Sequence, residues 1–194
     1  MSSVAPKDPA ETPQSEGQCP KDLAYYASLW SVGHVRLREV KKKDKVFSFY
    51  HLEAPDYPRG VFLPVPRGLG QAFLNQRIGV IHAPRTDDQG ALKGRLDYLR
   101  RLDPTLWERA PYFHLRARLT AVDLEEGKLQ VEVRPNPGGR LKEPFTLTLW
   151  APLSLLEALP PVGSAVYLEG ELRPKSGRLV VRRWEPARLW DDPQ

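Results

Sequence analysis

Two short stretches place histidine and arginine at alternate positions, a spacing that suits phosphate binding on the surface of a β-strand. "HVRLR" covers residues 34–38 and "HLRAR" covers residues 114–118. Because side chains alternate between the two faces of a strand, the apolar residues would face a core and the cationic ones would face outward. Outward arginines are also ordinary on solvated surfaces, so the pattern leaves both interpretations open. The outward candidates are His34, Arg36, Arg38, His114, Arg116 and Arg118.

Residue types that carry out catalysis or hold metals do not occur in a suitable arrangement. The four histidines are scattered, without the i,i+3 or i,i+4 spacing or the cysteine partners typical of zinc ligands. The glycine motifs of nucleotide sites and the "HExxH" motif of metalloproteases are missing. The single cysteine, Cys19, has no neighbouring base and cannot form an internal disulfide. We therefore expect a protein that is not an enzyme and needs no cofactor or metal.

Charge is distributed unevenly along the chain. Residues 20–104 hold 15 Lys and Arg against nine Asp and Glu, whereas residues 105–194 hold 13 against 12. A basic segment predicts an anionic partner, either a nucleic acid, a membrane surface or an acidic protein, although charge that serves only solubility looks similar. The sequence has neither a run of about 18 apolar residues nor the apolar core of a signal peptide, so we expect a cytoplasmic protein outside the membrane.

The order of predicted elements occurs twice. Residues 1–19 are rich in Pro, Ser and Glu and predict a disordered tail, and residues 21–30 predict a short lead-in helix. Residues 20–104 and 105–190 then each predict three strands, a short helix and two more strands, and residues 191–194 form an end tail. In the second half, the inward positions of the first strand are Phe113, Leu115, Ala117 and Leu119.

The second half, from "FHLRARLTAV" to "VGSAVYLEGELRPKSGRLVVRRW", resembles an OB fold of the single-stranded-DNA-binding type. Its most characteristic piece is "VG…VYLEGEL…RLVV", and the first half resembles a more diverged copy. The resemblance implies an all-β chain of two tandem five-stranded Greek-key OB-type barrels, each with a short helix between strands 3 and 4. Closing such a sheet into a barrel removes its exposed edges.

OB barrels of this kind bind oligonucleotides across strands two and three, between the one–two and four–five loops. Flexible cationic side chains in these loops suit contacts to a phosphate backbone. In the first half the one–two loop carries Lys41, Lys42, Lys43 and Lys45, and in the second half the four–five loop carries Arg173, Lys175 and Arg178.

Base stacking needs aromatic rings on the outer face, where each stacked base contributes about 1–3 kcal/mol. The phase of the second strand, residues 46–53, is ambiguous. One phase exposes Phe47, Phe49 and His51, and the other buries both phenylalanines. Phe62 opposes the apolar face of its strand and is therefore expected outside. The second half offers a weaker surface, because Glu132 would repel phosphate; its candidates are Arg134 and Trp150.

These features predict a protein that binds single-stranded nucleic acid, DNA in preference to RNA, with low sequence specificity, in replication, repair or recombination. The alternative is an OB-fold interaction subunit of a nucleic-acid-processing complex, in which the outer phenylalanines are buried against a partner protein. The sequence leaves open whether replication or repair proteins bind the chain and whether it forms homo-oligomers.

Overall fold

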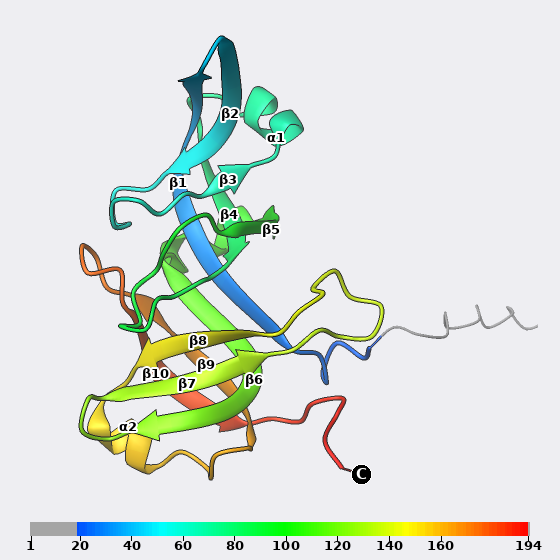
Figure 1. The fold of residues 1–194 in the computed structure, drawn as a ribbon, viewed down its shortest axis with the longest axis vertical. Coiled ribbons are helices and arrows are strands. Elements are labelled where there is room, and N and C mark those ends of the chain that lie inside the picture. The colour runs from blue at the N-terminus through cyan, green and yellow to red at the C-terminus, as the bar shows by residue number, and fades with distance from the viewer. Residues whose placement is uncertain (1–18, 194) are drawn as a thin grey trace, which may run out of the picture.

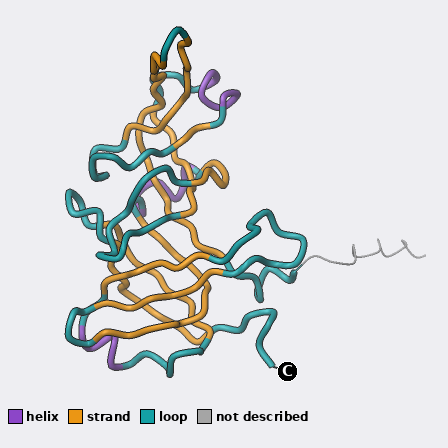
Figure 2. Tube along the Cα trace, viewed as in Figure 1, coloured by secondary structure: helices purple, strands orange, loops and turns teal. Residues whose placement is uncertain are grey.

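A computed structural model describes residues 19–193, and these residues form mainly β-strands that belong to one ten-stranded mixed sheet (Figures 1 and 2). The predicted all-β class is therefore confirmed. The predicted tail over residues 1–19 lies outside the described residues, except for Cys19. No helix within residues 19–193 has the length and hydropathy needed to cross a membrane.

The second half of the chain forms five strands whose pairing returns to its starting strand. They are β6 (Tyr112–Asp123), β7 (Lys128–Val133), β8 (Phe145–Trp150), β9 (Ala165–Leu172) and β10 (Leu179–Pro186), with the short helix α2 (Leu153–Glu157) after β8. β6 pairs antiparallel with β7, β7 with β8, β10 with β9, and β9 with β6. A parallel pair between Val180 and Trp150 joins β10 to β8.

The inward residues of β6 follow the alternation expected from the sequence. Phe113, Leu115, Ala117 and Leu119 are all fully buried in the main hydrophobic core. Gly170 on β9 faces this core, and an added Cβ there would overlap the Phe113 ring and the Val180 carbonyl. Close packing between β6, β9 and β10 therefore requires glycine at this position.

The first half contains the same sequence of elements, with a weaker third strand. Its elements are β1 (Tyr26–Lys42), β2 (Lys45–Glu53), β3 (Pro64–Val65), α1 (Arg67–Ala72), β4 (Arg77–Ala83) and β5 (Asp97–Arg101), followed by the 3₁₀ helix η1 (Pro104–Arg109). β1 pairs with β2 and β4, β2 with β3, and β4 with β5. An isolated parallel bridge between Phe62 and Arg95 connects the segments that precede β3 and β5.

The 17-residue strand β1 belongs to both halves. Its first residues, Tyr26 to Trp30, pair with β6, and Leu29 to His34 pair with β4. The lead-in helix predicted over residues 21–30 is therefore wrong: Leu23, Tyr26 and Trp30 have helical spacing, but residues from Tyr26 onward are strand. The hydrogen-bonding edge of β6, which is distant in sequence, outweighs this short local pattern.

Beyond Val35, β1 leaves the body of the protein and forms an arm with the start of β2 (Figure 1). We call residues 37–48 the arm, and every one of them is exposed. Leu37, expected on the same inward face as Val35, is 43% exposed, whereas Val35 is fully buried. The alternation is as expected, but within residues 19–193 no second layer of structure covers this part of the strand.

A buried histidine links β3 to β4. His82 is fully buried, and its Nε2 donates to the Pro64 carbonyl over 2.9 Å. Burial lowers the pKa of His82 to about 4, although the carbonyl and Asp97 oppose this shift. The ring is thus neutral in the folded protein near pH 7.

Acidification should therefore destabilise the protein through His82. The unfolded chain binds a proton near pH 6.5, whereas the folded chain resists it until about pH 4, so stability is lost as the pH falls across this interval. The loss is on the order of 3 kcal/mol. We expect the free energy of unfolding, measured by urea denaturation, to fall more steeply from pH 7 to 4 in the parent protein than in His82→Gln. Parallel pH profiles would contradict this assignment.

Candidate nucleic-acid interface

The packing of β2 fixes which of its side chains face outward. Leu52 is 3% exposed, and Tyr50 packs against Gly70 of α1, where an added Cβ would overlap the ring. These two residues share the inner face of the strand. Phe47, Phe49 and His51 therefore lie on the opposite, outer face, which is the phase that creates a surface platform.

The Phe62 ring contacts two rings on this outer face, those of Phe49 and His51, and we call these three residues the ring patch. Phe62 meets Phe49 edge to face with ring centroids 5.1 Å apart, and it stacks on His51 with centroids 5.8 Å apart. All three side chains are half-buried. Phe47, which is 50% exposed, continues the row along β2 toward the tip of the arm. The patch offers flat apolar surfaces that stacked bases could cover.

Cationic side chains border the ring patch on the same face. In the β1–β2 register, Arg38 lies opposite Phe49, and Lys42 lies opposite Lys45 near the tip. Arg36 lies opposite His51, but its guanidinium is held by Glu53 at 2.7 Å and by Asn75 at 3.0 Å. Arg36 is thus better suited to fixing the edge of the patch than to neutralising a phosphate.

Arg95 belongs to this surface and was missed by sequence reasoning. Its guanidinium lies 5.5 Å from the centroid of the Phe62 ring, and its backbone forms the parallel bridge to Phe62. The residue follows Gly94, whose φ of 64° is favoured by glycine. The local sequence carries no signal for this contact, because the pairing joins segments more than 30 residues apart.

The environment of His51 keeps its ring neutral at pH 7. Partial burial, together with the nearby Arg38 cation, lowers the pKa of His51 below its usual range. A neutral imidazole can stack on Phe62 without adding to the repulsion among the neighbouring guanidinium groups. The charge of the interface therefore comes from its arginines and lysines.

The other cations predicted in the first half are spread around the arm. Lys41 lies on the reverse face, opposite Val46, and Lys43 occupies the turn with a φ of 54°. His34 is exposed on the outer face, opposite Glu53. Only part of the predicted set therefore lies at the rings or on the same face nearer the tip. The members at the rings are Arg36, Arg38, Phe47, Phe49, His51 and Phe62, and those nearer the tip are Lys42 and Lys45.

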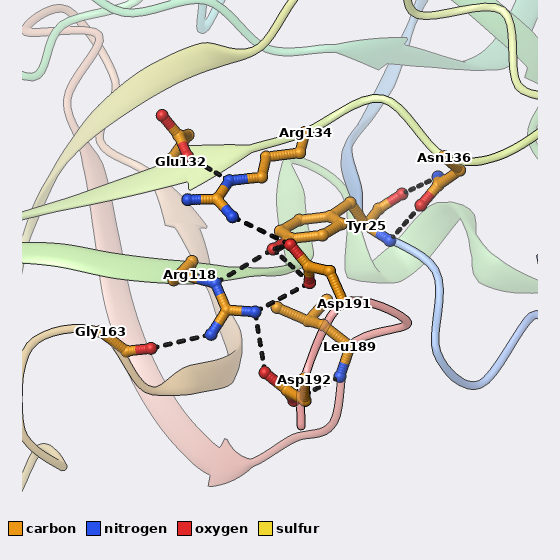
Figure 3. A network of polar contacts seen from close by, with 9 residues as sticks. All are labelled: Tyr25, Arg118, Glu132, Arg134, Asn136, Gly163, Leu189, Asp191 and Asp192. Atoms are coloured by element: carbon orange, nitrogen blue, oxygen red, sulfur yellow. Dashed lines mark hydrogen bonds and ion pairs between the residues drawn. The ribbon is translucent and has the colours of Figure 1, made fainter. Parts of the chain in front are cut away.

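Arg118, the counterpart of Arg38 in the second stretch, is held inside a polar network (Figure 3). Its guanidinium contacts Asp191 and Asp192, each at 2.8 Å, and also donates to the Tyr25 hydroxyl and the Gly163 carbonyl. Only 14% of the side chain is exposed. The residues expected to form an end tail thus hold this arginine away from solvent.

The network also fixes the start of β1. Tyr25 donates its hydroxyl to Asp191, and its backbone exchanges two hydrogen bonds with the Asn136 side chain. Arg134 reaches Asp191 at 2.9 Å and pairs with Glu132 as well. Burial raises the pKa of Asp191, but the hydrogen bonds from Tyr25, Arg118 and Arg134 outweigh it and hold that pKa below its usual range. Arg118 and Arg134 therefore hold Asp191 and the start of β1 together, and Arg134 remains 40% exposed.

His114 and Arg116 contact the first strand. His114 packs among the rings of Tyr26, Trp30 and Tyr112, and burial lowers its pKa to about 4. Arg116 donates to the Lys21 carbonyl at 2.9 Å and lies over the Tyr26 ring. The second stretch therefore supports the contact between β6 and β1 instead of forming an open cationic face.

The loop between β4 and β5, residues 84–96, packs against the surface of the second half that carries Trp150 and Arg178. Trp150 donates its indole N–H to the Gln89 carbonyl at 2.8 Å, and the Arg178 guanidinium stacks on the same ring at 4.0 Å. Ala91 pairs with Arg178, and the Thr86 hydroxyl accepts the backbone N–H of Thr148. Arg173, 3.8 Å from Glu171, and Lys175, with a φ of 66°, stay on the exposed turn beyond this contact.

Comparison with protein-family models, with curated proteins and with solved structures finds no match to this chain. Within residues 19–193, no group of three or more His, Cys, Asp or Glu side chains is arranged to hold a metal ion. The assignment of a function therefore rests on the geometry of the outer face of β1, β2 and the segment before β3.

Replacing Arg118 should reduce stability without affecting ligand binding. Arg118→Ala leaves the Asp191 and Asp192 carboxylates partly buried without their main partner, which costs about 3 kcal/mol. We expect a lower melting temperature in differential scanning calorimetry. Affinity for an oligonucleotide, measured below the new melting temperature, should stay at the parent value. A loss of affinity with unchanged melting temperature would place Arg118 in the interface instead.

Proposed function

We propose that this protein binds single-stranded nucleic acid, DNA in preference to RNA, on the outer face of its first half, with little sequence specificity. We further propose that each half is an OB-type barrel. The observation that carries the proposal is the ring patch itself, a partly exposed aromatic surface bordered by Arg38 and Arg95 and continued on the same face by Lys42 and Lys45 toward the tip of the arm. Stacked rings combined with mobile cations match bases and phosphates at the same time.

The strand order supports the OB-type interpretation. In the second half, the first strand pairs with the second and fourth, and the third pairs in parallel with the fifth. In the first half, β1 pairs with β2 and β4, and the Phe62–Arg95 bridge takes the place of the parallel pair. The ring patch lies on the second strand and the segment leading to the third, where barrels of this class take oligonucleotides.

The two halves have different roles in this proposal. The second half keeps Trp150 under the loop of residues 84–96 and Arg118 in ion pairs, so in this proposal it serves as a support for the first half. The first half presents the ligand surface. This division fits the charge distribution, because the basic residues are concentrated in residues 20–104.

The alternative is a protein-interaction subunit whose partner covers the same rings. Cationic residues around the patch favour an anionic ligand, but an acidic protein would also satisfy them. The ring patch and the arm contain no tryptophan, so fluorescence anisotropy of a labelled oligo-dT is a better assay than tryptophan quenching. Tight, salt-sensitive binding of the oligonucleotide supports the proposal, and its absence favours the protein partner.

Neutralising the lysines of the arm should flatten the salt dependence of binding. The fourfold variant Lys41→Gln, Lys42→Gln, Lys43→Gln, Lys45→Gln removes two potential phosphate contacts on the outer face, those of Lys42 and Lys45, and two lysines that lie off that face. The slope of log affinity against log salt should fall in magnitude by about 1.4 on a single strand, because two phosphate contacts are lost. The measurement is an anisotropy titration of labelled oligo-dT at several salt concentrations.

A matched control removes four exposed cations elsewhere, at Lys21, Arg140, Lys142 and Arg188. It changes the net charge equally, so it separates local contacts from the overall field of the protein. We expect its salt slope to match that of the parent protein. If both variants lower the slope equally, the lysines of the arm have no specific role.

Removing a ring from the patch should reduce the binding free energy by the amount that one stacked base contributes. Phe62→Ala should reduce affinity for oligo-dT by about 1–3 kcal/mol, roughly fivefold to 150-fold. Phe145→Ala is the control, because Phe145 is also half-buried under a guanidinium, that of Arg85 at 3.6 Å, but lies in the second half. Equal affinities of the two variants for oligo-dT would show that the ring patch is not part of the binding site.

A further inference from the structure

The arm has features that a ligand lying only on the ring patch does not explain. Exposed apolar side chains occur on both of its faces: Val40 (39% exposed) and Phe47 (50%) on the outer face, and Leu37 (43%) and Val46 (60%) on the reverse face. A two-stranded ribbon has no core of its own to bury either set. Both faces are therefore available to a partner that surrounds the ribbon.

The arm is also open along both edges. Pairing of β1 with β4 ends at His34, the bridge to Leu74 ends at Val35, and pairing of β2 with β3 begins at Tyr50. Within residues 19–193, no other strand pairs with the arm beyond these points. Figure 1 shows the arm projecting at the top of the molecule, away from the body. A projecting ribbon of this kind can enter a groove.

Charge indicates which partner would surround it. The arm carries Arg38 and four lysines against only Glu39 and Asp44. No ion pair among the described residues engages Arg38 or the lysines. A second copy of the same arm would bring like charges together, whereas a polyanion would neutralise them. A nucleic-acid groove can surround both faces of the arm and also neutralise its positive charge.

We propose that the arm lies in the major groove of a duplex that adjoins the single strand, so that the protein recognises a junction between single-stranded and double-stranded DNA. This inference rests on the proposed function. Two paired strands are roughly 10 Å across, and the major groove of B-DNA is about 12 Å wide and admits a two-stranded ribbon.

The arrangement of contacts follows from the register of β1 and β2. The ring patch holds unpaired bases at the base of the arm, and Lys42 and Lys45 extend the same face toward the tip. Lys41 on the reverse face and Lys43 in the turn lie where a single strand on the ring patch would not reach them. In a groove they contact phosphates of the opposite wall, and the exposed aliphatic side chains contact base edges and thymine methyl groups.

A hollow on the reverse side of the base of the arm adds to this surface. It has a volume of about 440 Å³, and Leu37, Tyr50, Val65 and Arg67 contribute to its lining. Arg67 is exposed at the start of α1. A duplex backbone passing behind the arm would meet this guanidinium, whereas a single strand confined to the outer face would not.

The test compares three labelled DNAs by anisotropy with the full chain: a single strand of about 15 nucleotides, a duplex of about one helical turn, and a junction that joins the two. We expect the junction to bind at least about tenfold more tightly than the single strand, with a steeper salt dependence because Lys41 and Lys43 make additional contacts. Equal affinity of the junction and the single strand would overturn the junction inference and leave the proposed function intact. Failure of the single strand to bind would reject the proposed function itself.

The variant Leu37→Thr, Val46→Thr removes the apolar side chains of the reverse face only. We expect it to lose the preference for the junction and to bind the single strand like the parent protein. The matched control is Leu99→Thr, Val162→Thr, since those side chains are 43% and 59% exposed and lie elsewhere. The control should keep the junction preference. If the parent chain sediments as a dimer that the arm variant abolishes, the reverse face binds a second copy and the junction inference is wrong.

Discussion

The rest of the structure depends on the hydrogen bonding of one strand. β1 pairs first with β6, then with β4 and finally with β2, so a single extended segment connects the second half, the first half and the arm. The polar network of Tyr25, Arg118 and Asp191 fixes the start of this strand. The arm and the ring patch therefore project from a strand whose other end is firmly held.

This arrangement explains why the two similar stretches, residues 34–38 and 114–118, have different surroundings. Arg38 and Arg118 occupy equivalent positions in "HVRLR" and "HLRAR". Arg118 lies beside Asp191 and Asp192, so its charge contributes to folding, whereas Arg38 lies on the arm without an acidic partner in the described part of the chain. The same residue type thus stabilises one half and, in the other, has no ion pair within residues 19–193 and is exposed.

The sequence predicted the second half well because its alternation is strict: Phe113, Leu115 and Ala117 are all buried as expected. It failed where distant partners decide the structure. Residues from Tyr26 onward form a strand because β6 lies beside them, and Leu37 is exposed because no described part of the chain covers it. For the site, β2 alternates in a way that permits either phase, and only Tyr50 packing on α1 settles it. Arg95 reaches Phe62 through a long-range pairing that no local pattern indicates.

The most direct test of the central claim is a map of where a nucleic acid touches the protein. An oligo-dT containing 5-iodouracil, irradiated in complex with the full chain and analysed by mass spectrometry, forms covalent links to the aromatic side chains on which it stacks. We expect the links at Phe49 and Phe62, with Phe47 as a further site. Links confined to residues 112–119 or to Trp150, with none on β2 or Phe62, would contradict the proposed binding surface.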